Sequence, residues 1–104
     1  MKIQKDHNIV CIAKIVVKAD KLDQACQIFA KLKELSPKEP GCISYKLHQD
    51  TENPNIFLFI DKFKDMDAFN YHCAQSYTVE YFDNLLPGLT ESMEFMTFNE
   101  IEIK

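Results

Sequence analysis

Residues 56–63 read Ile-Phe-Leu-Phe-Ile-Asp-Lys-Phe, and this run carries large apolar side chains at consecutive positions. In a β-strand, Phe57 and Phe59 would point to one side, and Leu58 and Ile60 to the other. A strand with one face in water alternates apolar with polar residues, so this strand is predicted to be covered on both faces. The fold must therefore supply apolar cover for two sides of one sheet.

The segment before this strand predicts a hairpin. Residues 42–49 alternate in the pattern of a strand, with Tyr45 and Leu47 on one face. Residues 50–55 have turn composition and are too few for a crossover connection. Residues 42–49 and 56–63 are therefore predicted to pair as antiparallel strands.

The first part of the chain predicts a strand followed by a helix. Residues 9–17 are almost continuously apolar and rich in β-branched side chains, which is typical of a strand buried on both faces. Apolar residues then recur at helical spacing from Leu22 to Leu35. Asp20 is expected to be the N-cap of this helix, and Pro37 to end it.

The remainder of the chain completes an α+β pattern. Asp65 and Ser76 are expected to cap two short helices, with Pro87-Gly88 ending the second, and residues 91–103 are expected to form the last strand. The resulting order, β-α-β-β-α-β, predicts one domain over residues 1–104, with a four-stranded antiparallel sheet of ferredoxin-like topology. Helices in such a domain cover only one face of the sheet.

The other face of the predicted sheet is also apolar. It would carry Val10, Ile12, Val16, Leu58 and Ile60. Monomeric proteins rarely expose more than a few hundred Å² of contiguous apolar surface. We therefore predict a homodimer in which two copies of this face pack against each other.

Composition excludes several classes of partner. The net charge is −4, with acidic and basic residues interspersed, so no basic surface for nucleic acid is expected. No apolar run approaches the roughly 20 residues that span a bilayer, and the first residues lack a signal-peptide pattern. We therefore expect a cytoplasmic protein that binds neither nucleic acid nor membrane.

The residues that usually hold metals and nucleotides are scattered. The cysteines and histidines include no CxxC pair or other zinc spacing, and comprise Cys11, Cys26, Cys42, Cys73, His7, His48 and His72. Reduced cysteines that pack in the core are expected, and no metal site. Glycine occurs only at Gly41 and Gly88, so a phosphate-binding loop is not expected, and no cofactor is predicted.

A resemblance to a known family begins at residues 39–45, Glu-Pro-Gly-Cys-Ile-Ser-Tyr, and continues through residues 47–50 and 52–54. It extends through Phe57, Phe59, Asp61, Phe63, Lys64, Asp65, Ala68, His72 and Ser76. In the order and spacing of these residues, almost the whole chain resembles the antibiotic biosynthesis monooxygenase family. The resemblance implies a dimeric α+β barrel whose two sheets face each other, and this agrees with the prediction from the two apolar faces.

The chain departs from the family pattern at several positions. Family members commonly carry Glu at the position of Asp61, Trp at that of Phe63, and His at that of Tyr77. The haem-degrading branch needs an Asn and a Trp where this chain has Ala13 and His72, so haem degradation is disfavoured. Relatives also include an isomerase of a phosphorylated signalling sugar, so the fold alone does not dictate oxygenation.

His72 and Asp61 are the candidate catalytic residues. His72 follows Phe69 by one helical turn and could face a pocket as a general base, whereas a histidine bonded to a backbone carbonyl or water is the alternative. Asp61 shares a strand face with Phe57 and Phe59, where a carboxylate must be paired, hydrogen-bonded or orienting a base. A structural ion pair of Asp61 is an equally good interpretation.

Five aromatic residues are the candidate substrate-binding residues. Tyr45 and Tyr77 could each donate a hydrogen bond to a ligand oxygen. Phe59, Phe63 and Phe82 could wall an apolar pocket. The alternative for all of them is an ordinary place in the core.

By the resemblance, the leading hypothesis is a cofactor-independent monooxygenase. It would oxidise a small, electron-rich, quinol-like aromatic with molecular oxygen, in a pocket between helices and sheet. A second hypothesis is an isomerase that shuttles a proton within a small carbonyl compound. A third is a non-catalytic dimeric module for ligand binding or stress response.

Overall fold

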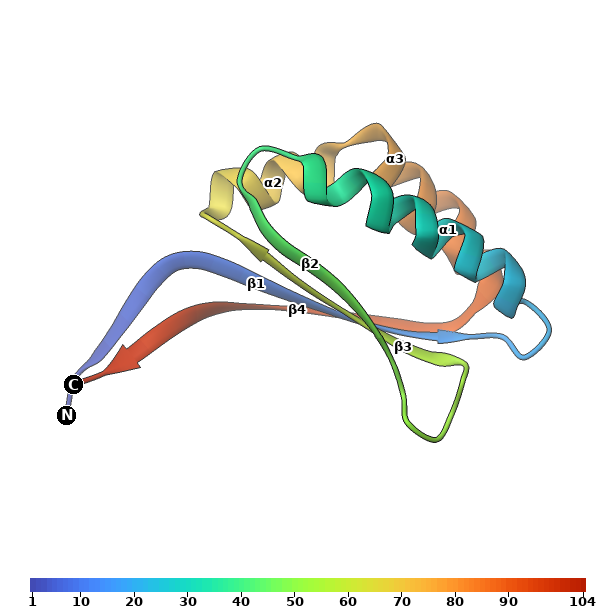
Figure 1. The fold of residues 1–104 in the computed structure, drawn as a ribbon, viewed down its shortest axis with the longest axis horizontal. Helices are drawn as coiled ribbons and strands as arrows, with labels where there is room; N and C mark the ends of the chain where they lie inside the picture. Colours follow the sequence, from blue (N-terminus) through green and yellow to red (C-terminus); the bar gives the residue numbers. More distant parts are fainter.

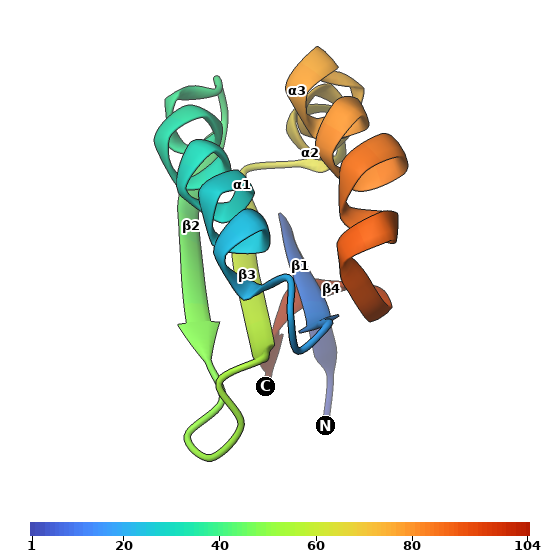
Figure 2. The same ribbon diagram turned by 90° about the vertical axis from the view of Figure 1, so that its right-hand side faces the viewer.

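The structure is a computed structural model that describes residues 1–104, and it has two layers (Figure 1). One layer is a four-stranded antiparallel sheet in the order β2-β3-β1-β4, and the other consists of helices on one face of it (Figure 2). The strands are β1 (Ile3–Val17), β2 (Cys42–Gln49), β3 (Ile56–Phe63) and β4 (Thr90–Ile103). The helical segments are α1 (Leu22–Leu35), η1 (Ser36–Lys38), α2 (Met66–Ala74), α3 (Ser76–Val79), η2 (Glu80–Leu85) and η3 (Leu86–Leu89). The predicted β-α-β-β-α-β order and ferredoxin-like arrangement are confirmed.

Both central strands are ones that the sequence marks as apolar on both faces. β3 pairs with β2 and with β1, and β1 pairs with β4. The antiparallel hairpin of β2 and β3 is confirmed. This register places Asp61 opposite Cys11 on one side and opposite Tyr45 on the other.

The helix-facing side of the sheet forms the core. Phe29 of α1 packs against Phe57 and Phe59 of β3, with ring centroids 5.0 and 5.3 Å apart. Each of these aromatic side chains is almost fully buried. Burial of a Phe or Leu side chain is worth about 1.5–3 kcal/mol, so this contact is a main source of stability.

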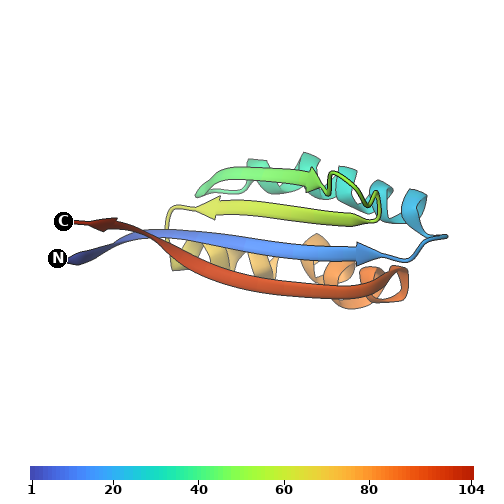
Figure 3. The ribbon, with the colours of Figure 1, turned by 90° about the horizontal axis from the view of Figure 1, so that it is seen from below.

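The opposite face of the sheet has no helix over it, as Figure 3 shows from below. Leu58 and Ile60 are only partly buried there, and Met96 and Phe98 of the edge strand are each 49% exposed. The register sets Ile12 beside both Ile60 and Met96. An apolar strip therefore crosses three strands on the uncovered face.

The first strand is longer than predicted. It begins at Ile3 rather than at residue 9, because Ile3 pairs with Ile103 after an irregularity in the β1–β4 ladder. The backbones of Lys2 and Lys104 exchange two hydrogen bonds, 2.6 and 2.8 Å long, at the end of this ribbon. The first and last strands therefore extend together beyond the rest of the sheet (Figure 1).

The expected N-caps are right at one helix and wrong at two. Asp65 caps α2 and accepts a 2.8 Å hydrogen bond from the backbone N–H of Ala68. Asp20 does not cap α1, because a turn from Lys18 to Lys21 places Lys21 at the N-cap. Ser76 is already helical in α3, so it is not the cap.

The end of the second helical region also differs from the prediction. Pro87-Gly88 does not end it but lies inside η3, since proline is tolerated in the first turn of a helix, where its missing N–H has no partner. The last strand accordingly begins at Thr90.

None of the helices combines the length and the apolar composition that are needed to span a membrane.

The turn into β2 depends on Gly41. Its φ of +82° lies in the left-handed region, and an added Cβ would come 2.6 Å from the Cβ of Ala68. We expect Gly41→Ala to lower the free energy of unfolding by about 2 kcal/mol or more, through backbone strain and this clash. Chemical denaturation would measure the change.

Gly88→Ala is the matched control, since an added Cβ there meets nothing within 4 Å. It should change the free energy of unfolding by less than about 0.5 kcal/mol. Equal losses in the two variants would show that the backbone conformation at Gly41 is not required.

Candidate functional site

A cavity of about 330 Å³ lies between the sheet and the helices that follow β3. Its floor comes from β1, β2 and β3, its far wall from α2, α3 and η2, and its rim from the edge strand β4. It is lined by Cys11, Ala13, Tyr45, Phe59, Asp61, Phe69, His72, Cys73, Thr78, Val79, Phe82, Asp83, Phe95, Met96 and Thr97. The lining is mostly apolar, with a few polar groups, which is typical of a small-molecule site.

His72 lies in the wall of this cavity and is held by a buried carboxylate. The cap at Asp65 fixes the start of α2, and Ala68 and His72, one turn apart, form its buried face. The Nδ1 atom of His72 is 2.8 Å from Oε1 of Glu39. The imidazole also packs against Phe63, at 4.9 Å between ring centroids, so its position is fixed from two sides.

The pairing with Glu39 defines which nitrogen of His72 is free. An ionised carboxylate can only accept hydrogen bonds, so Nδ1 of His72 carries a hydrogen and donates a hydrogen bond to Glu39. The Tyr77 hydroxyl donates to the other oxygen of the same carboxylate. In the neutral imidazole, Nε2 of His72 is then the acceptor nitrogen, as required of a general base.

Asp61 is the second ionisable group in the wall of the cavity. It is 4% exposed, takes part in no ion pair, and its Oδ1 has no hydrogen-bond partner. Burial, and then the negative charge of Glu39, raise the pKa of Asp61 to about 8. The structural ion pair is therefore absent, and a largely protonated carboxyl group stands in its place at neutral pH.

The structure brings most of the candidate residues together. Tyr45, Phe59 and Phe82 line the cavity with the two catalytic candidates, and burial raises the pKa of the Tyr45 phenol far above its usual range. Phe63 and Tyr77 do not line it. Phe63 packs behind His72, and Tyr77 supports Glu39, so both act on the site from behind.

Two buried polar residues of the site, Glu39 and Thr78, could not be singled out from the sequence. Glu39 appeared only as part of a family motif, although it is the partner of His72. Thr78 lines the cavity with its Oγ1 buried and without a partner. The Glu before a Pro-Gly turn and the Thr in a short helix carry no sequence signal of burial, so neither could be singled out by pattern alone.

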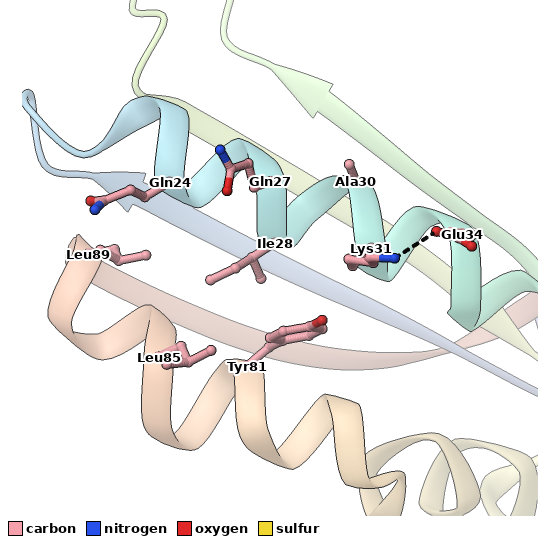
Figure 4. Close-up of a pocket in the computed structure, with 9 residues that line it drawn as sticks. All are labelled: Gln24, Gln27, Ile28, Ala30, Lys31, Glu34, Tyr81, Leu85 and Leu89. Atoms are coloured by element: carbon pink, nitrogen blue, oxygen red, sulfur yellow. Dashed lines mark ion pairs between the residues drawn. The ribbon is translucent and has the colours of Figure 1, made fainter.

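A second, larger depression lies on the helix layer between α1 and η2, as Figure 4 shows. It measures about 720 Å³ and is open to solvent. Lys31 and Glu34 form an exposed ion pair at its edge, 3.5 Å apart. It holds none of the buried titratable groups, so the smaller cavity is the candidate site.

No group of His, Cys, Asp and Glu side chains in the structure is arranged to hold a metal ion.

Comparison with known proteins agrees with this architecture. The sequence model of the family described as antibiotic biosynthesis monooxygenase matches residues 8–84. The chain belongs to this family. It is also 35% identical over 97 residues to an uncharacterised protein of Synechocystis, covering 93% of this chain and 66% of the length of that relative.

Solved structures of family members and relatives share the fold. A protein of Shewanella oneidensis superimposes with a TM-score of 0.89 at 31% identity, over 96% of this chain and 98% of that chain. A crystal structure described as an antibiotic biosynthesis monooxygenase superimposes with a TM-score of 0.80 at 23% identity, over 92% and 99% of the two chains. At that lower identity the similarity establishes the fold alone.

The raised pKa of Asp61 predicts a pH-dependent penalty on stability. Its folded-state pKa of about 8 lies above the ordinary value of 3.8, so as the pH rises the unfolded chain releases this proton first. Burial of Asp61 therefore costs no ionisation free energy below about pH 4, where both states are protonated. The free energy of unfolding falls as the pH rises from there towards about 8. Asp61→Asn should raise the Tm relative to the wild type, and by more at about pH 8 than at about pH 5.

Asp67→Asn, at an exposed position on α2, is the control and should show a Tm difference that does not change with pH. Thermal melts across this range would make the measurement. A constant difference for Asp61→Asn would mean that the Asp61 carboxyl is ionised in the folded protein.

Proposed function

We propose that the cavity is the active site of a cofactor-independent monooxygenase that oxidises a small, electron-rich, quinol-like aromatic. One observation carries the proposal: an imidazole with one nitrogen held by a buried carboxylate and the other free, in the wall of an apolar cavity. Such a group can remove a proton from a phenol without needing a metal or a nucleotide. The family of the chain supports the same reaction class.

His72 begins the proposed reaction as the base. Its Nε2 takes the proton of a substrate hydroxyl, and the resulting phenolate passes an electron to molecular oxygen. The two radicals combine at a ring carbon to give a peroxide, which takes the proton back from His72, and loss of water from this hydroperoxide leaves a quinone. One oxygen atom enters the product and the other leaves as water, so the substrate supplies all the electrons.

The other residues of the site position the substrate or the base. Glu39 holds the tautomer of His72 and stabilises the imidazolium when the proton arrives, which makes it a positioning residue. Phe59 and Phe82 wall the cavity and exclude water. Asp61 and Tyr45 are proposed to contact the oxygen substituents of the substrate.

A second candidate function is isomerisation of a small carbonyl compound. The observation that favours it is that an acceptor nitrogen and a protonated carboxyl group, those of His72 and Asp61, line the same cavity. Such a pair can remove a proton at one carbon and deliver one elsewhere. Consumption of oxygen separates the two reactions, and binding without turnover would favour a ligand-binding module.

We also propose that the protein is a homodimer. The apolar strip on the uncovered sheet face, with Leu58 and Ile60 at its centre, is the surface that a second copy would cover. Two copies of the same face satisfy the two-fold symmetry that dimers usually adopt. The family resemblance supports this arrangement.

Replacing Leu58 with Asp would place a charge in the centre of that interface, and we expect the dimer to dissociate. Analytical ultracentrifugation at micromolar concentration would measure it. Met66→Asp, at an apolar and exposed residue on α2, is the control and should leave the dimer intact. A wild-type protein that sediments as a monomer would contradict the proposed dimer.

His72→Ala should lower the rate of oxygen uptake with a reduced quinone by roughly 10²- to 10⁴-fold, the usual worth of a positioned base. An oxygen electrode would follow the reaction, with the uncatalysed rate in buffer subtracted.

Glu39→Gln should leave KM nearly unchanged while lowering kcat and shifting the pH profile of kcat, because the base loses its carboxylate partner.

His7→Ala is the matched control, since this histidine is exposed and outside the cavity. Thermal melts of each variant would show that the fold is retained. Uptake by His72→Ala at the wild-type rate per folded molecule would exclude a catalytic role for this residue.

A further inference from the structure

The cavity contains two buried polar atoms that no atom of the chain satisfies. Oδ1 of Asp61 and Oγ1 of Thr78 have no hydrogen-bond partner, and both residues line the cavity. They come from different elements, β3 and α3. Buried polar groups are almost always paired, since an unpaired one costs about 1–3 kcal/mol. The chain itself leaves both groups in the cavity wall without a partner, so water or a molecule bound there must supply one.

Asp61 is poorly explained as a structural residue. It is flanked on its own strand face by Phe59 and Phe63, and across the register by Cys11 and Tyr45. None of these side chains is a cation that could neutralise a carboxylate. An Ala or Val in this position would complete the core without the cost of burial.

The state of the carboxyl group determines what it can recognise. Burial and the nearby charge of Glu39 hold the pKa of Asp61 at about 8, so its neutral form predominates at pH 7. A neutral carboxyl has one O–H donor, whereas a carboxylate has none. The protonated group can therefore donate a hydrogen bond to an acceptor atom of a ligand, which a carboxylate cannot do.

We propose that Asp61 binds the ligand as a protonated acid, donating a hydrogen bond to a ligand carbonyl or phenolate oxygen, so that the cavity selects oxygen-bearing aromatics over hydrocarbons of the same shape. This rests on the proposed function, because it assigns the ligand of the same cavity. It gives Asp61 the role of a hydrogen-bond donor and leaves the role of base to His72.

The geometry supports a ligand with more than one oxygen. Tyr45 lies beside both groups, since it is opposite Asp61 in the sheet and its ring is 5.8 Å from that of His72. Asp61 and His72 line the same cavity, so a ligand with two oxygens can present one to each of them. Thr78 offers a further hydroxyl from α3. A quinol or a hydroxylated aromatic carbonyl has this arrangement of oxygens.

Most of the titratable groups around Asp61 do not ionise in the pH range in which Asp61 does. Burial raises the pKa of Cys11 to about 12 and that of Cys42 to about 11, and it also raises those of Cys73 and Tyr45. These groups therefore stay neutral where Asp61 ionises. The remaining titratable groups near the cavity are Glu39, His72 and Asp83.

Equilibrium dialysis of duroquinone against durene tests the proposal. The two molecules have the same ring and methyl groups, and only duroquinone carries carbonyl oxygens. Its ring is fully methylated and resists addition of thiols, which matters because Cys73 is exposed. Asp61→Leu should weaken duroquinone binding by roughly 3- to 10-fold, the usual worth of one hydrogen bond, and leave durene binding unchanged.

Asp61→Asn should retain duroquinone binding within about threefold, because its amide also donates a hydrogen bond. Wild-type affinity for duroquinone should fall as the pH rises through about 8, whereas that of Asp61→Asn should not. This comparison holds even if Asp61→Leu fails to fold. Because the wild type and Asp61→Asn both retain His72 and Glu39, a pH dependence seen only in the wild type cannot come from those two residues.

Three results would overturn the proposal: Asp61→Leu losing no selectivity for duroquinone, Asp61→Asn binding as weakly as Asp61→Leu, or wild-type affinity rising above about pH 8. The first would mean that water alone pairs with Asp61. Oxygen uptake is a separate measurement. Selective binding without turnover would leave this inference standing and remove the oxygenase, whereas turnover with unselective binding would do the reverse.

Discussion

The buried carboxylate of Glu39 is the interaction on which the arrangement of the site depends. It accepts hydrogen bonds from His72 on α2 and from Tyr77 on α3, while its own backbone N–H donates to the carbonyl of Ser36 at the start of η1. Three segments are thereby joined beside the cavity. Gly41, two residues later, lets α2 approach closely enough for this contact, because its missing Cβ is where Ala68 packs.

The two buried carboxyl groups of the site have opposite surroundings. Glu39 accepts hydrogen bonds from two side-chain donors. Asp61 lies on the strand face between aromatic residues and has none, so it holds its proton instead. The cavity wall thus contains a base, His72, which Glu39 holds in place, and an acid, Asp61. This division of roles is common in sites that move protons at neutral pH.

The sequence predicts the features of this protein that repeat along the chain, and it misses those that depend on distant contacts. The run of consecutive apolar residues around Phe57 and Phe59 is visible locally, and so is the cap at Asp65, whose partner is three residues away. Glu39 and His72 are separated by 33 residues, so nothing near either one indicates their contact. Asp20 failed as a cap for a related reason. The turn that follows β1 sets where α1 starts, and cap chemistry alone does not.

The pairing of the first strand with the last has a consequence for how the chain acquires its fold. β1 lies between β3 and β4 in the sheet, and the bonds between Lys2 and Lys104 join nearly the two ends of the sequence. Contacts this distant in sequence require closure of a loop of almost the whole chain, and such topologies fold slowly. During synthesis β1 emerges first and must wait for both of its neighbours. In that interval its two apolar faces are free to associate with other chains, so early aggregation is the hazard that this topology carries.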